Sequence, residues 1–458
     1  MPRIQAGFLY LGYFILLLVC VMPHGMRTPL VRWCDPAFVH EQPCTAGFIT
    51  PAATNADIIR LFQTADPGSI ANEARGFAER HDFAHITSWP DWPPAMVTLQ
   101  TMLYAISPQM KVGLVLILLE CALWAAVFCY TALLLREGLE DLAAIALPLL
   151  MLLTGEFTYY FHIGVFYSES ISIAAFLLGA AVLLTAVAQK SLKRAFFAGM
   201  LFALSSYFRA QTELVMNLLL ALALASLALC FFLRRENLRP LLKGGWIGCI
   251  VLALVAYQLC TFPCRVQHGM QLTNMTGSAM WPPTWTMKSE ATPDVRFYIF
   301  GGGMEGCEAD PDLCAEIHAR HAAAGKEIFS TEDYFHFTIR SMSHHPLRWL
   351  ALKLPYLKDF WMNAPQEAQP WESWMDVPQE PLLLLALLIL LLARCVWVRD
   401  GWHLALGACL LATIAGIVIP PFIAHFEARY LYQCKIFILY AALLAMGRGD
   451  RNAYAYLK

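Results

Sequence analysis

The clearest indication of the fold lies in residues 163–187, which read IGVFYSESISIAAFLLGAAVLLTAV. Apart from the polar group Tyr167 to Ser170, the run is largely apolar, and its one charged residue is Glu169. A helix needs about 20 mostly apolar residues to cross the hydrocarbon core of a bilayer. The segment therefore predicts a membrane-spanning helix with polar residues near its beginning.

The composition of the whole chain also indicates a membrane protein. Of its 458 residues, 58% are hydrophobic and only 14% are charged, and the mean hydropathy is +0.52. Soluble domains have about 25% charged residues. The 32 Lys and Arg residues nearly balance the 34 Asp and Glu residues, so no basic field would attract nucleic acid. We expect an all-α polytopic membrane protein without a nucleic-acid partner.

The same length criterion predicts ten spans along the chain. The first, GFLYLGYFILLLVCVM, has no small-residue cleavage site after it, so we interpret it as an uncleaved span rather than a signal peptide. The other spans are expected near residues 110–134, 141–155, 163–187, 195–208, 213–233, 244–262, 381–398, 402–424 and 430–447. The third and fifth spans are short.

Basic residues near the span ends predict the orientation, because cytoplasmic loops carry an excess of Lys and Arg. In this ten-span order they fall on one side: Arg136, Lys190, Lys193, Arg194, Arg234, Arg235, Arg239, Lys243, Arg394, Arg399, Arg448, Arg451 and Lys458. That side is predicted to be the cytoplasm and to hold both termini.

Two long polar loops then lie on the opposite side, and they divide the chain into three parts. Residues 1–262 form an N-terminal transmembrane module that includes the first outer loop, 23–109. Residues 263–380 form the second outer loop, and residues 381–458 hold the C-terminal helices. We expect interfacial and short helices within both loops.

The first outer loop contains the polar segment Ala65 to Pro94, ADPGSIANEARGFAERHDFAHITSWPDWPP. Its acids could supply a catalytic acid or base, and Asp66 is the first candidate. The fallback acids are Glu73, Asp91 and Asp57. A loop Asp beside Pro and Gly is also a common turn former, so the residue types alone leave both interpretations open.

Polar residues also gather at the predicted outer ends of several spans. They include Tyr167, Glu169, Arg209, Glu213, His425, Glu427, Arg429 and Tyr430. Charges near the hydrocarbon are costly, about 2.5 to 3.5 kcal/mol each at a helix centre, so their convergence suggests a cavity. Single interfacial residues could equally point to water. Glu120 differs, because it lies midway along a span, in LILLECALW.

Cysteine positions suggest disulfides in the outer loops. Cys34 and Cys44 share the first loop, and Cys307 and Cys314 share the second. Both pairs are candidate disulfides if the loops face an oxidising compartment. His318 and His321 follow the second pair, but their spacing fits no tight zinc pattern, so we expect no metal site there.

The combination of these motifs resembles the GT-C glycosyltransferases. Asp66, the Ala74–Arg75 pair and the Pro93–Pro94 pair resemble the family's first outer loop, although Pro67 stands where many members have a second acid. FYSES, residues 166–170, resembles a helix start in the mannosyltransferases of GPI-anchor assembly and their bacterial relatives. HFEARY, residues 425–430, resembles the H-x-E-R-Y element before the last span of bacterial members.

The resemblance implies an inverting transfer of a sugar, mannose being the first candidate, from a polyprenyl-phosphate donor. It implies that Asp66 is the base and that Arg429, Arg209 and His425 bind the donor phosphate. Glu169, Tyr167, Glu427, Tyr430 and Glu213 would line the cavity. The acceptor is a lipid, a glycan or a protein. The resemblance leaves open whether the reaction uses a divalent cation such as Mg²⁺ or Mn²⁺.

Three other classes of enzyme would also place their site on the outer face and use a carrier lipid: a lipid-linked glycan ligase, a polymerase and an acyltransferase. A secondary transporter fits less well, because the sequence has no internal symmetry and no paired broken helices. We expect the bacterial inner membrane with the loops in the periplasm, or the endoplasmic reticulum with lumenal loops in a eukaryote.

Overall fold

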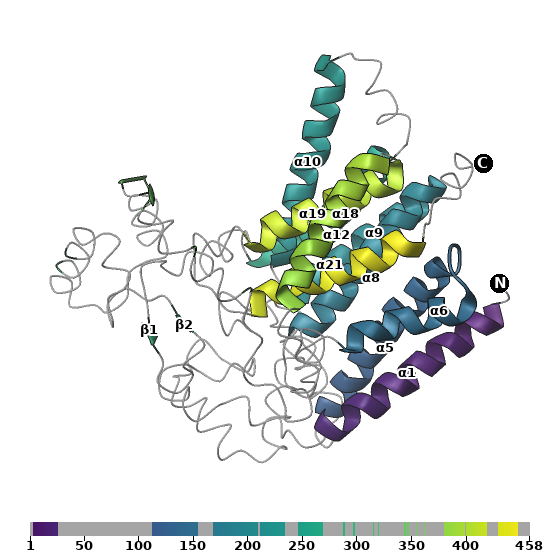
Figure 1. The fold of residues 1–458 in the computed structure, drawn as a ribbon. Helices are drawn as coiled ribbons and strands as arrows, with labels where there is room; N and C mark the ends of the chain where they lie inside the picture. Colours follow the sequence, from purple (N-terminus) through teal and green to yellow (C-terminus); the bar gives the residue numbers. More distant parts are fainter. Residues whose placement is uncertain are drawn as a thin grey trace, which may run out of the picture.

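The computed structural model describes a helical bundle in separate stretches of the chain (Figure 1). The described residues are 3–25, 112–153, 168–208, 211–233, 246–268, 380–398, 400–418 and 429–447. Isolated positions between 287 and 361 are described as well. Residues 26–111, which contain all but the first three residues of the predicted first outer loop, lie outside this part.

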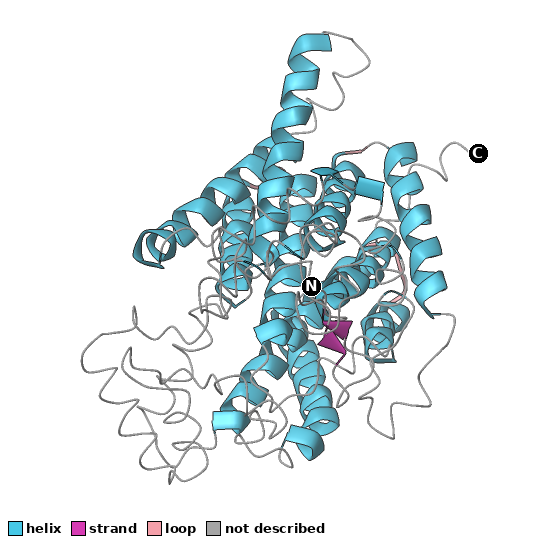
Figure 2. Cartoon of the chain, turned by 90° about the vertical axis from the view of Figure 1, so that its left-hand side faces the viewer, coloured by secondary structure: helices cyan, strands magenta, loops and turns pink. Residues whose placement is uncertain are grey.

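The described elements are almost all helices (Figure 2). They are α1 (Arg3–Gly25), α5 (Val112–Leu135), α6 (Asp141–Ala146), the 3₁₀ helix η3 (Leu147–Leu153), α8 (Ser168–Gln189), α9 (Leu192–Phe208), α10 (Gln211–Leu233), α12 (Trp246–His268), α18 (Glu380–Val398), α19 (Gly401–Val418) and α21 (Arg429–Gly447). Two two-residue strands, β1 (Met287–Lys288) and β2 (Arg296–Phe297), pair antiparallel.

The prediction of an all-α polytopic membrane protein is confirmed. Within the described residues, three helices are long and apolar enough to cross a bilayer: Leu118–Leu135, Ser170–Gln189 and Gly401–Val418. Shorter apolar helices stand at other predicted spans, among them Thr212–Ala225 and Trp246–Phe262. Helices suit this environment because their backbone groups bond within the helix and need no water.

The third predicted span, residues 141–155, is not one continuous helix. The α-helix α6 stops at Ala146 after six residues, and η3 continues as a 3₁₀ helix. Pro148 explains the change, because its ring removes a backbone donor and clashes with the carbonyl of the preceding turn. This segment is therefore too short to span alone. It packs against α5, and the Tyr13 hydroxyl of α1 donates to its Ile145 carbonyl at 2.7 Å.

Neighbouring helices along the chain run antiparallel. The Tyr10 hydroxyl of α1 donates to the Ala122 carbonyl of α5 (3.2 Å), whereas the Cys129 thiol contacts the Ala6 carbonyl (3.6 Å), so the two sequences ascend in opposite directions. α8 and α9 form a tight hairpin, in which Lys190 adopts a left-handed φ of 52° to reverse the chain. Each reversal returns the chain to the opposite end of the bundle.

The two ends of the bundle differ in charge. One, the basic end, holds Arg136, Lys190, Lys193, Arg194 and Arg394 at the ends of α5, α8, α9 and α18. The other, the polar end, is where α8, α10 and α21 begin and α9 ends, and it holds Ser170, Thr212, Glu213 and Gln433. Hydrogen bonds within each end join different helices: Gln433 of α21 donates to Thr212 of α10 at the polar end, and Arg394 of α18 donates to His403 of α19 at the basic end. The predicted gathering of these basic residues at one end is confirmed, while the side of the membrane stays a prediction.

Small residues allow the helices to approach closely. A Cβ atom at Gly199 of α9 would collide with the Ala253 carbonyl of α12 and would lie 2.7 Å from the Ala256 Cβ. A Cβ atom at Gly416 of α19 would lie 2.8 Å from Val215 of α10. Membrane helices associate through such close packing, because lipid tails are as apolar as their side chains.

We expect Gly199→Ala to destabilise the bundle by about 1–3 kcal/mol, since α9 and α12 would have to separate. The measurement is the thermal unfolding midpoint of the purified protein in detergent. Gly248→Ala in α12 is the matched control, because nothing lies within 4 Å of its Cβ position. Equal midpoints for the two variants would contradict the close approach.

We expect the basic end to face the cytoplasm. Green fluorescent protein fused after Lys458 should then fluoresce in bacterial cells. Alkaline phosphatase at the same position should stay inactive, because it needs an oxidising compartment to form its disulfides. An active phosphatase fusion would reverse the orientation.

Candidate functional site

The polar end is held together by hydrogen bonds between hydroxyl groups on different helices. Ser172 of α8 and Ser205 of α9 lie 2.9 Å apart at their Oγ atoms, and Ser205 also donates to the Ser172 carbonyl, 2.8 Å. Ser205 Oγ lies 2.8 Å from Thr212 Oγ1 of α10, to which Gln433 Nε2 of α21 donates at 3.5 Å. We call Ser172, Ser205, Thr212 and Gln433 the hydroxyl network. It joins α8, α9, α10 and α21 at one level.

Three charged side chains are buried in the same helices or in their neighbour α5. Glu120 of α5 is 3% exposed, Glu213 of α10 is 1% exposed and Lys435 of α21 is fully buried. Intramembrane charges are rare and face the interior of a bundle or a water-filled cavity. Their burial therefore favours a functional interior over a lipid-facing position.

Glu213 owes its position to the start of a helix. It is the acidic residue in the first turn of α10, directly after Thr212 of the hydroxyl network. The N-terminus of a helix carries a partial positive charge that favours a carboxylate. The same backbone groups also suit an anionic ligand. Glu213 is buried at the polar end, and its place in the wall of a cavity stays a prediction.

The parallel helices α5, α8 and α21 share a common register. Thr131 of α5 donates to, or accepts from, the Tyr440 hydroxyl of α21 at 2.9 Å, and Trp124 Nε1 of α5 donates to Ser170 Oγ of α8 at 3.1 Å. Counting about three turns back from Thr131 and from Tyr440 reaches Glu120 and Arg429, respectively. The first residue of α21, Arg429, therefore lies at the level of Glu120 along the bundle axis.

Lys435 is the buried charge that the sequence pattern did not single out. It lies one to two turns inside α21 from Arg429, and its Nζ is 5.7 Å from the Trp361 ring centroid. Such a geometry is a cation–π contact. The available signal was a single Lys within the apolar run LYQCKIFILY. Gln433, 2% exposed, was missed for the same reason.

Most other predicted site residues lie outside the described part of the chain. They are Asp66, Glu73, Asp91, Asp57, Arg209, His425, Tyr167 and Glu427. For Glu169, Arg429 and Tyr430 the structure describes only the backbone, at the starts of α8 and α21. Their roles stay predictions, as does the division of the chain into three parts.

The candidate disulfide residues Cys34, Cys44, Cys307 and Cys314 also lie outside the described residues. Seven cysteines whose side chains the structure describes, among them Cys121, Cys249 and Cys434, are free thiols within helices. The described residues contain no cluster of three metal-ligating side chains.

Comparison with known proteins leaves the family unassigned. No protein-family model matches the chain, and no curated protein matches it. Among solved structures, the chain is similar to the archaeal oligosaccharyltransferase AglB from Archaeoglobus fulgidus, in complex with an inhibitory peptide and a dolichol-phosphate, at 15% identity and a TM-score of 0.44. The match covers 86% of this chain and 47% of AglB, so the chain spans about half of that protein's length. Similarity at this level does not establish a shared fold or activity.

We expect Ser205→Ala to lower the free energy of unfolding by about 1–2 kcal/mol, because it removes the hydroxyl that joins α8 to α10. The unfolding midpoint in detergent would report the change. Thr413→Val is the control, since that buried hydroxyl bonds the Cys409 carbonyl of its own helix. A larger loss in the control would contradict the role of the network.

Proposed function

We propose that the protein is an inverting GT-C-type glycosyltransferase that uses a polyprenyl-phosphate-linked sugar at the polar end. The observation that supports this most is the presence of three buried charges near the start of α21. Glu120 of α5 and Glu213 of α10 are buried close to the level at which α21 begins, and Lys435 is buried within α21. A lipid-carried donor enters from the bilayer, so its phosphate needs cationic and N–H donors near the membrane surface. The start of α21 offers both through Arg429 and its helix N-terminus.

In the proposed reaction, an acceptor hydroxyl attacks the anomeric carbon of the donor sugar. The Asp66 carboxylate takes the hydroxyl proton, the new glycosidic bond forms, and the bond between the sugar and the phosphate oxygen breaks. The lipid phosphate leaves with the bonding electrons and is stabilised by Arg429, with Arg209 and His425 assisting. One displacement inverts the anomeric configuration.

The cavity residues would orient the two substrates. Glu213 and the hydroxyl network can accept and donate hydrogen bonds to sugar hydroxyls, and Glu169, Tyr167, Glu427 and Tyr430 are proposed to complete the wall. We propose mannose as the first sugar to test, an acceptor that is a lipid, glycan or protein, and Mg²⁺ or Mn²⁺ as an optional cofactor. The polar end would face the periplasm in a bacterium or the lumen of the endoplasmic reticulum in a eukaryote.

We expect Asp66→Asn to abolish sugar transfer, because an amide cannot take the acceptor proton. Mass spectrometry of lipid-linked intermediates and glycans would compare cells lacking the protein with cells that carry each variant. Glu140→Gln at the basic end is the control and should restore the wild-type glycan profile. Normal transfer by Asp66→Asn would exclude this base.

Arg429→Ala should weaken use of the lipid-linked donor by about tenfold or more, because a charge-assisted bond to phosphate is lost. The measurement is the transfer rate against donor concentration in reconstituted vesicles. Arg429→Lys keeps the charge but not the two-pronged geometry, and it should recover only part of the activity.

An unchanged glycan profile in cells that lack the protein would contradict sugar transfer and would favour a transporter or an acyltransferase.

A further inference from the structure

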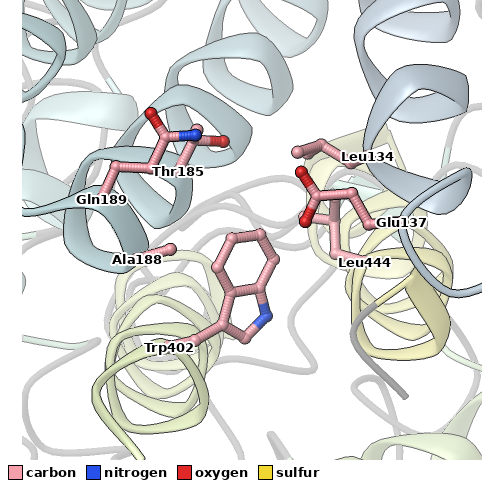
Figure 3. Close-up of a pocket in the computed structure, with 7 residues that line it drawn as sticks. All are labelled: Leu134, Glu137, Thr185, Ala188, Gln189, Trp402 and Leu444. Atoms are coloured by element: carbon pink, nitrogen blue, oxygen red, sulfur yellow. The ribbon is translucent and has the colours of Figure 1, made fainter. Parts of the chain in front are cut away.

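A cavity at the basic end is separate from the proposed site. It has a volume of about 230 Å³ and is lined by Leu134, Glu137, Thr185, Ala188, Gln189, Trp402 and Leu444. These residues come from the last turns of α5, α8 and α21, the turn after α5, and the start of α19 (Figure 3). Drug-sized ligands occupy about 300–1,000 Å³, so this cavity suits a smaller polar group.

The lining residues favour a cation. Glu137 contributes a carboxylate, and the Trp402 ring lies between Glu137 on one side and Thr185 with Gln189 on the other (Figure 3). An indole face attracts ammonium groups, and a carboxylate in the same cavity adds an opposite charge. The seven lining residues include no Lys, Arg or His. An anion would therefore find no opposite charge inside the cavity.

The hydrogen-bonding state of Thr185 favours a ligand that donates N–H groups. Its hydroxyl already donates to the Ala181 carbonyl at 2.8 Å, so toward the cavity Thr185 Oγ1 can only accept. Glu137, when ionised, also only accepts. A primary ammonium has three N–H donors and can use both acceptors, whereas a quaternary ammonium has none.

Two basic residues beside the cavity could pair with the negative group of a zwitterionic ligand. The Arg194 guanidinium donates to Gln189 Oε1, and Lys190 follows Gln189 directly in the chain. Both basic residues therefore stand beside the cavity wall and not inside it. Glu137 and Gln189 are themselves exposed, so the carboxylate and the two basic residues lie together at the mouth of the cavity. A zwitterionic headgroup can pair its ammonium with Glu137 and its phosphate with the basic residues there.

The surroundings of the basic end indicate a lipid source for this headgroup. Trp397 is 88% exposed at the end of α18, and Leu192 is 62% exposed at the start of α9. Exposed Trp beside apolar helix ends marks the level of the lipid headgroups. The cavity residues lie at the same end of the bundle, so a headgroup bound there could keep its acyl chains in the bilayer.

We propose that the Glu137 and Trp402 cavity binds the headgroup of an aminophospholipid, with the primary ammonium between Glu137 and Thr185. The inference is independent of the glycosyl transfer proposed above, because the cavity lies at the other end of the bundle. It assigns to the basic end a lipid-binding site for the leaflet that this end faces.

The test uses the full-length protein in nanodiscs of phosphatidylcholine, with or without phosphatidylethanolamine, followed by native mass spectrometry. We expect the wild-type protein to retain phosphatidylethanolamine in preference to phosphatidylcholine. Glu137→Gln should weaken that retention by about tenfold, because the charge-assisted bond is lost. Thr185→Val, which keeps the shape of the side chain, should weaken it by a smaller factor.

Glu140→Gln is the matched control, since Glu140 is an exposed acid three residues away that does not line the cavity. It should retain the lipid as the wild-type protein does. Equal loss in Glu137→Gln and Glu140→Gln, or equal retention of phosphatidylcholine, would overturn the proposal. Free ethanolamine added to phosphatidylcholine nanodiscs tests whether the bound amine must belong to a lipid. Saturable binding of free ethanolamine without retention of phosphatidylethanolamine would overturn the lipid assignment.

Discussion

Hydrogen bonds between Ser172, Ser205 and Thr212 hold three helices together at the polar end. In a bilayer, helices gain little from burying apolar side chains against one another, so close packing and interhelical hydrogen bonds carry much of their association. The network therefore does more than satisfy three hydroxyl groups. It sets the start of α10 against α9, and with it the buried position of Glu213, the residue that follows Thr212.

The level of α21 depends on a second set of contacts. Its Tyr440 hydroxyl meets Thr131 of α5, and its Phe437 ring lies 5.2 Å from the Phe176 ring of α8. These contacts put the beginning of α21 at the polar end, where Gln433 joins the hydroxyl network. Lys435 is buried in the same helix, at a position where a long cationic side chain would be costly without a functional or structural reason.

The two ends of the bundle suit different ligands. The N-termini of α8, α10 and α21 lie at the polar end, and helix N-termini favour anions. The proposed lipid phosphate would use them, at a distance from the buried Glu120 and Glu213 carboxylates. The basic end carries cations beside a cavity that is lined by the exposed Glu137 carboxylate and the buried Trp402 ring, which favour an ammonium group. In the two functions proposed above, the protein would contact lipid at both ends, through a phosphate at the polar end and an ammonium group at the basic end.

Residues 163–187 were enough to predict a membrane helix, and the lengths of the apolar runs predicted nine of the ten segments as continuous helices in the described part of the chain. This is possible because a bilayer leaves the backbone few choices, and apolar length is read directly from the chain. The exception, residues 141–155, could have been anticipated from Pro148. Lys435, Gln433 and the Glu137 cavity could not, because they depend on which faces of separate helices meet. Side-chain contacts between α5, α8, α19 and α21 decide that, and no local pattern encodes them.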